Sequence, residues 1–111
     1  MNMETIITKG QKQDLAEVLK LIKELAIYEQ AGDEVTISLN ELINDGFGPR
    51  PLFHFLMAKD AHGKTLGMAF YYYAYSTWKG KCIYLEDIVV REGFRGKGIG
   101  SRLFESVIKA A

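Results

Sequence analysis

The chain has 111 residues, with 14 basic and 14 acidic side chains and a formal net charge of zero. This length suits one domain with a hydrophobic core, and the balanced charge argues against a nucleic-acid-binding arm. No apolar run reaches the roughly 18 residues of a membrane span. Cys82 is the only cysteine, so neither an internal disulfide nor a cysteine-based metal set is available. We therefore expect a soluble cytoplasmic protein that binds no metal, membrane or nucleic acid.

The first half of the chain predicts one strand followed by two helices. Residues 5–8 are a short run of β-branched side chains, which favours a strand. From Leu15 onward, apolar side chains recur at the helical period of about 3.6 residues, which indicates a helix packed on a core. Ser38 and Glu41 form a capping box that predicts a short helix over about 39–45, and Gly46 is expected to end it in the left-handed conformation.

The second half predicts three strands and a final helix. Residues 52–58 follow two prolines and are apolar on both faces, which is typical of a central strand. A polar turn precedes an aromatic-rich strand over 65–75, and a second turn precedes a strand over 82–90. The last helix is predicted from a stripe of apolar residues, which are Leu103, Phe104, Val107, Ile108 and Ala111.

A basic, glycine-rich loop joins the last predicted strand to the last helix. It reads Arg95-Gly96-Lys97-Gly98-Ile99-Gly100-Ser101. The first N–H groups of a helix have no intrahelical partner, and the helix dipole favours an anion beside them. Glycines let an anion approach these amides and permit positive φ where the chain turns, while the arginine and the lysine add positive charge. The loop therefore predicts a site for a phosphate-bearing cofactor, with pyrophosphate as its natural ligand.

The residues of this loop do not fit two other phosphate-binding motifs. A P-loop requires Ser or Thr after the Gly-Lys pair, but Gly98 follows Lys97. A dinucleotide-binding fingerprint that begins at Gly96 requires a glycine where the chain has Ser101. A glycine-rich surface turn without a ligand is the remaining alternative. The apolar strand that feeds the loop favours a functional site over that alternative.

Arg95, Gly98 and Gly100 have the R-x-x-G-x-G spacing that binds acetyl-coenzyme A in the GCN5-related N-acetyltransferase superfamily, which this segment resembles. The order strand-helix-helix-strand-strand-strand-helix is that of the first two thirds of such a domain. Within the superfamily, the chain resembles the diamine (spermidine/spermine) and thialysine N-acetyltransferases. The stretches that carry this resemblance are residues 21–26, Tyr28-Glu29, residues 45–48, Tyr71-Tyr72, Trp78, Gly80-Lys81 and residues 84–87.

The resemblance implies an α/β (α+β) protein with the acyl-CoA N-acyltransferase fold, a mixed and mostly antiparallel sheet flanked by helices. Residues 1–111 would be the N-terminal two thirds of a single acetyltransferase domain, without its C-terminal strands. It also implies direct acetyl transfer from acetyl-coenzyme A to a primary amine of a diamine, polyamine or thialysine-like substrate, in a homodimer. The general acid of the family cannot be assigned to any residue here. A non-catalytic remnant that binds coenzyme A or forms dimers is the alternative.

For the cofactor, the resemblance assigns the main chain of the last predicted strand to the pantetheine arm. The residues concerned are Ile88, Val89 and Val90, and the N–H group of Val89 would polarise the thioester carbonyl. The pyrophosphate would be held by seven consecutive residues: Arg95, Gly96, Lys97, Gly98, Ile99, Gly100 and Ser101.

For the small cationic amine, the resemblance assigns Tyr28, Glu29 and Glu86 as substrate contacts. Asp87 and Trp78 are lesser candidates, and Glu86, directly or through a water, is the candidate proton acceptor. From the residues alone, Glu29 fits a solvated carboxylate at a helix end. Glu86 and Asp87 lie inside an apolar strand, where charge is costly unless it is used or paired. A regular strand would direct only one of the two into a pocket, and a bulge would change that.

Overall fold

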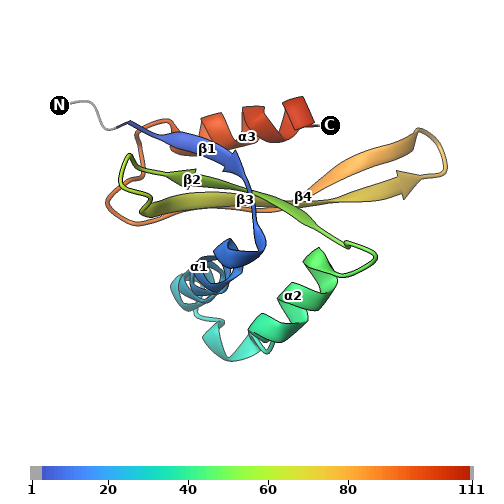
Figure 1. Cartoon of the computed structure of the whole chain (residues 1–111), viewed down its shortest axis with the longest axis horizontal. Helices are drawn as coiled ribbons and strands as arrows, with labels where there is room; N and C mark the ends of the chain where they lie inside the picture. Colours follow the sequence, from blue (N-terminus) through green and yellow to red (C-terminus); the bar gives the residue numbers. More distant parts are fainter. Residues whose placement is uncertain (1–3, 111) are drawn as a thin grey trace.

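The computed structural model describes residues 4–110 as a four-stranded sheet with helices on both faces (Figure 1). In chain order the elements are β1 (Ile6–Lys9), α1 (Leu15–Tyr28), α2 (Leu39–Phe47), β2 (His54–Lys59), β3 (Thr65–Ser76), β4 (Gly80–Val90) and α3 (Ile99–Ala110). Figure 1 shows α1 and α2 on one side of the sheet and α3 on the other. Ala111, part of the expected helical stripe, lies outside the described residues. None of the described helices is long and apolar enough to cross a membrane.

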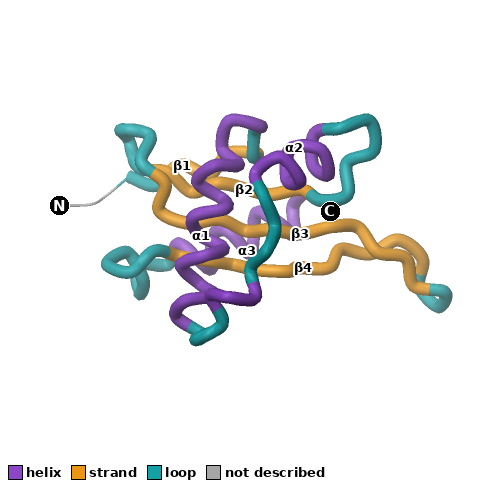
Figure 2. The backbone as a smooth tube through the Cα atoms, turned by 90° about the horizontal axis from the view of Figure 1, so that it is seen from below, coloured by secondary structure: helices purple, strands orange, loops and turns teal. Residues whose placement is uncertain are grey.

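The sheet has the strand order β1-β2-β3-β4, and each neighbouring pair is antiparallel. Within residues 4–110, β4 pairs only with β3, so its other edge is open. β3 and β4 also extend beyond the other strands as a long hairpin, which projects to the right in Figures 1 and 2. The open edge of β4 and the root of this hairpin are where the candidate site lies.

Alternate residues of β2 fill two separate cores, one on each face of the sheet. Phe55 and Met57 pack with α1, whereas Leu56 and Ala58 pack with α3. This division explains why residues 52–58 are apolar without interruption, and it confirms the prediction of a central strand. The largest fully buried side chains come from both cores: Leu15, Leu21, Leu42, Met57, Leu66, Met68, Leu103 and Val18.

The second helix confirms its predicted start but not its predicted end. Ser38 Oγ accepts the Glu41 N–H at 3.1 Å, and the Glu41 carboxylate accepts the Ser38 N–H at 3.2 Å, which completes the capping box. The expected left-handed stop at Gly46 is wrong, because α2 continues to Phe47 and Gly46 does not have a positive φ. A Cβ at position 46 would collide with the ring of Phe53. The glycine therefore makes room for an aromatic ring of the core.

Two ionic clusters attach α1 to the sheet, and neither was visible in the sequence. At the start of the helix, Asp14 accepts Lys59 Nζ at 2.7 Å and the Gln11 N–H at 2.9 Å, and Asp14 is only 7% exposed. Farther along, the guanidinium of Arg91 contacts carboxylates of α1. Its partners are Glu17 at 3.1 Å, Glu24 at 3.4 Å and the Thr65 carbonyl at 3.2 Å. These contacts hold α1 beside the end of β4.

Candidate active site

β4 has a bulge at Glu86. Asp87 pairs with Phe70 and Leu85 pairs with Tyr71, so Glu86 has no partner across the ladder. Leu85 and Ile88 both pack against the α3 core, yet two residues rather than one separate them. Neither Glu86 nor Asp87 therefore points toward the α3 side of the sheet. The bulge answers the question that the sequence left open, because it takes both carboxylates away from the α3 side.

Glu86 and Glu29, the residue that caps the C-terminal end of α1, both act electrostatically on Asp87. Burial raises the pKa of Asp87 above its ordinary value of 3.8, and the negative charges of Glu86 and Glu29 raise that pKa further. Within residues 4–110, no lysine, arginine or histidine pairs with any of these three carboxylates. We call Glu29, Glu86 and Asp87 the acidic cluster, because the charges of the other two act on Asp87; their combined negative charge favours a cation.

Two tyrosines adjoin this acidic cluster. Tyr72 and Tyr84 are directly opposite on β3 and β4, and their rings stack with centroids 5.0 Å apart. Burial, then the charges of Tyr84 and Glu86, raise the pKa of the Tyr72 phenol. Trp78, in contrast, is 93% exposed in the hairpin turn. No described hydrogen bond or ion pair joins the Trp78 side chain to the carboxylates.

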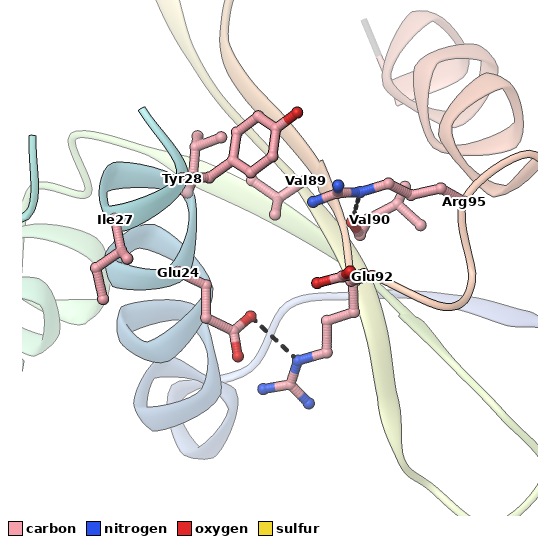
Figure 3. Close-up of a pocket in the computed structure, with 9 residues that line it drawn as sticks. Glu24, Ile27, Tyr28, Val89, Val90, Glu92 and Arg95 are labelled. Carbon is pink, nitrogen blue, oxygen red and sulfur yellow. Dashed lines mark hydrogen bonds and ion pairs between the residues drawn. The ribbon is translucent and has the colours of Figure 1, made fainter. Parts of the chain in front are cut away.

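A cleft of about 410 Å³ separates the C-terminal half of α1 from the end of β4. Figure 3 shows Tyr28 and Arg95 reaching toward each other across this cleft, above Val89 and Val90. Tyr28 is 74% exposed, so its ring is accessible from solvent. The lining residues are Glu24, Leu25, Ile27, Tyr28, Val89, Val90, Arg91, Glu92 and Arg95.

The main chain of β4 presents alternate residues to the open edge. In an antiparallel ladder, the N–H and C=O groups of every second residue point to the same neighbour. The Arg91 N–H donates to the Leu66 carbonyl at 2.8 Å, so the main-chain N–H and C=O groups of Arg91 and Val89 point toward β3. The main-chain groups of Ile88 and Val90 consequently point toward the open edge. This differs from the expectation that the Val89 N–H is free for a thioester carbonyl, because the register directs that group into the ladder.

The glycine loop forms a second cavity of about 280 Å³ at the N-terminus of α3. Gly96 and Gly98 have φ values of 78° and 82°, the left-handed region that favours glycine. Gly98 is also the N-cap, since its carbonyl accepts the Arg102 N–H at 3.1 Å, which leaves the N–H groups of residues 99–101 without helical partners. Gly100 lies within α3 and does not have a positive φ.

Arg95 lies where the two cavities meet and lines both. Its Nε–H donates to the Val90 carbonyl at 2.8 Å, and its guanidinium carbon is 5.4 Å from the centroid of the Tyr28 ring. Lys97 instead lies 5.8 Å from the centroid of the Phe94 ring. The structure thus has an acidic cluster, an open edge of β4 and, at the start of α3, three N–H groups without helical partners.

Comparison with known proteins shows the family to which this chain belongs. The sequence profile described as the Acetyltransferase (GNAT) family matches residues 15–111. The chain belongs to the GNAT acetyltransferase family. It is 43% identical over 113 residues to thialysine N-epsilon-acetyltransferase of Bos taurus. This alignment covers 96% of this chain and 66% of that protein. The chain therefore spans slightly less than two thirds of that relative.

A second relative of this GNAT chain is the spermidine/spermine N(1)-acetyltransferase-like protein 1 of Homo sapiens. It is 38% identical over 111 residues, which are 95% of this chain and 16% of that protein. Among solved structures, an aminoglycoside acetyltransferase from an uncultured soil metagenomic sample superimposes with a TM-score of 0.76 at 17% identity. The match covers 96% of this chain and 68% of that one, and it supports the fold alone.

Several site features were missed from the sequence. Arg91 and Glu24 join β4 to α1 and also line the cleft, but they are 67 positions apart in the chain. The stacking of Tyr72 on Tyr84 requires the register of β3 and β4. The spacing of the aromatic residues in this hairpin was the one signal in the sequence from which its register, and so the pair, could have been predicted.

The raised pKa of Asp87 predicts a pH-dependent gain of stability in Asp87→Asn. The folded protein holds the Asp87 proton more tightly than the unfolded chain, so wild-type stability falls as pH rises from 3.8 through the folded-state pKa. At pH 7, Asp87→Asn should therefore melt at a higher temperature than the wild type. Below the ordinary carboxyl pKa the difference should vanish, as thermal unfolding followed by circular dichroism will show.

Asp60→Asn is the matched control for this experiment. The backbone N–H of Lys64 is the main cause that lowers the pKa of Asp60, in the turn between β2 and β3. Its contribution to stability is therefore present at neutral pH and lost as pH falls through the folded-state pKa. Asp60→Asn should melt below the wild type at pH 7. The same sign of change in both variants would contradict the assignment of Asp87 to an acidic cluster.

Proposed function

We propose that this GNAT chain takes part in direct acetyl transfer from acetyl-coenzyme A to a primary amine of a diamine, polyamine or thialysine-like substrate. The observation that carries the proposal is the order of features along β4. The acidic cluster at the bulge comes first, the outward edge of Ile88 and Val90 follows, and the amides at the start of α3 come last. An anionic cofactor and a cationic acceptor would thus meet at one strand.

The glycine loop fits the pyrophosphate of this cofactor. The N–H groups of residues 99–101 have no helical partners, and Gly96 and Gly98 carry no side chain that would cover them. Arg95 and Lys97 would supply positive charge. The outward N–H and C=O groups of Ile88 and Val90 would pair with the pantetheine arm, in place of Val89. When bound, acetyl-coenzyme A supplies an acetyl group activated as a thioester.

The acidic cluster fits the acceptor amine. The acceptor arrives as an ammonium group, which must lose a proton before its nitrogen can attack a carbonyl carbon. Glu86, directly or through a water, would accept that proton and leave a neutral amine. As the C–N bond forms and the C–S bond breaks, coenzyme A would leave as a thiolate and the nitrogen would release its second proton to solvent. Glu29 and Asp87 would attract a second ammonium group of the substrate, and the faces of Tyr72 and Tyr84 suit its alkyl chain and charge. The thialysine and spermidine/spermine names of the relatives support this class of substrate.

An acetylation assay tests this function. The purified chain would be given acetyl-coenzyme A with 1,3-diaminopropane, spermidine or thialysine, and acetylated product would be measured by mass spectrometry. We expect turnover with at least one amine, and a decrease of about 100-fold or more in kcat/KM for Glu86→Gln. Glu105→Gln, an exposed carboxylate on α3, is the control and should keep the wild-type rate. An equal rate for Glu86→Gln and the control would contradict the role of Glu86.

Calorimetry distinguishes the second function, a non-catalytic protein that binds coenzyme A or forms dimers. Binding of coenzyme A without transfer to any amine would favour that alternative. Absence of coenzyme A binding would contradict both. A homodimer and a cytoplasmic location stay predictions, to be measured by analytical ultracentrifugation and by fractionation of cells.

A further inference from the structure

Arg95 is turned toward the cleft rather than toward the amides of its own loop. Its Nε–H donates to the Val90 carbonyl at 2.8 Å, and its guanidinium lies over the ring of Tyr28, 5.4 Å from the centroid (Figure 3). Together with Val90, Arg95 lines both the 410 Å³ cleft and the 280 Å³ loop cavity. Each of its two partners belongs to a different part of the proposed site.

The Val90 carbonyl is an outward-facing acceptor of β4, so an extended amide-containing arm laid along this edge requires it. Tyr28 is the proposed contact of the amine. One side chain thus occupies an acceptor needed by the cofactor and a ring needed by the substrate. Both contacts are exposed and involve uncharged partners, whereas a pyrophosphate at the start of α3 offers the guanidinium a charged, bidentate partner.

We infer that Arg95 is a positioning residue that couples the two halves of the site. It closes the edge of β4 through Val90 and Tyr28, and a pyrophosphate at the loop withdraws it. Its withdrawal frees the Val90 carbonyl for the pantetheine arm and the Tyr28 ring for the amine. This inference rests on the proposed function. It predicts that the same arginine helps a ligand that carries phosphates and hinders a ligand that lacks them.

Two probes separate these effects: coenzyme A, and pantetheine, which has the arm without the phosphates. Binding to the full chain would be measured by calorimetry for coenzyme A and by chemical-shift titration for pantetheine. Arg95→Ala should weaken coenzyme A about tenfold or more and strengthen pantetheine about two- to fivefold, the size of an exposed cation–π contact. Because Arg95 is exposed, we expect this variant to fold. Tyr28→Leu should strengthen pantetheine similarly, and Tyr28→Phe should not.

Lys97→Ala is the charge-matched control, because Lys97 lies near Phe94 rather than at the edge of β4. It should weaken coenzyme A and leave pantetheine binding unchanged. Weaker or unchanged pantetheine binding in Arg95→Ala, in a chain that binds coenzyme A, would overturn the coupling role alone. A wild-type chain that binds no coenzyme A would overturn the proposed function and this inference with it.

Discussion

Gly98→Val is expected to weaken coenzyme A binding by about 100-fold, as measured by calorimetry. Gly98 has a φ of 82° and caps α3. A β-branched residue held in that region costs about 1–3 kcal/mol, so the loop would relax to another conformation. The N–H groups of residues 99–101 would then lose their common direction, and a new side chain would stand beside them. A loss of about 2.7 kcal/mol corresponds to the expected factor.

Gly63→Val is the matched control for the loop. Gly63 also has a φ of 82°, and a Cβ there would also meet nothing within 4 Å. It lies in the turn between β2 and β3, where its N–H donates to the Asp60 carbonyl at 3.1 Å. The two variants therefore carry the same strain with the same free space. We expect similar losses of thermal stability and an unchanged coenzyme A affinity only in Gly63→Val. Equal losses of affinity would show that the loop acts only through stability.

The glycine loop could be predicted from the sequence because its geometry is local. The left-handed glycines, the helix start and the basic side chains all fall within the seven residues 95–101, so no tertiary information is needed to place them. The same holds for the capping box of α2. Gly46 shows the limit of local reading, because the ring that requires it comes from Phe53, on a later segment.

The acidic side of the site could be predicted only in part. Glu86 and Asp87 stood out as charges in an apolar strand, but the bulge that takes both to one side depends on the register with Phe70 and Tyr71. Glu29 looked like a solvated helix end, and its approach to Asp87 follows from the position of α1 on the sheet. That position is set by ionic contacts that span 45 to 74 residues of chain, which sequence periodicity does not report.

Asp14→Ala is expected to lower the free energy of unfolding by about 2–3 kcal/mol. The Asp14 side chain is 9% exposed and that of Lys59 is 28% exposed, so removal of the carboxylate leaves a partly buried ammonium without its partner. The variant also loses the acceptor for the Gln11 N–H that precedes α1. Urea unfolding followed by circular dichroism would measure this loss, which for a domain of this size corresponds to roughly 10 °C in melting temperature.

Lys20→Ala is the control. The Lys20 side chain, which pairs with Glu17, is 66% exposed, so this ion pair should contribute less than about 0.5 kcal/mol to stability. The double variant Asp14→Leu with Lys59→Met tests the physical cause. If the cost arises from one unpaired buried charge, replacing both partners with apolar side chains should recover part of the loss. An equal loss in Asp14→Ala and Lys20→Ala would contradict the buried pair. The same pair fixes the start of α1, so Asp14→Ala should also loosen the helix whose far end presents Tyr28 and Glu29 to the site.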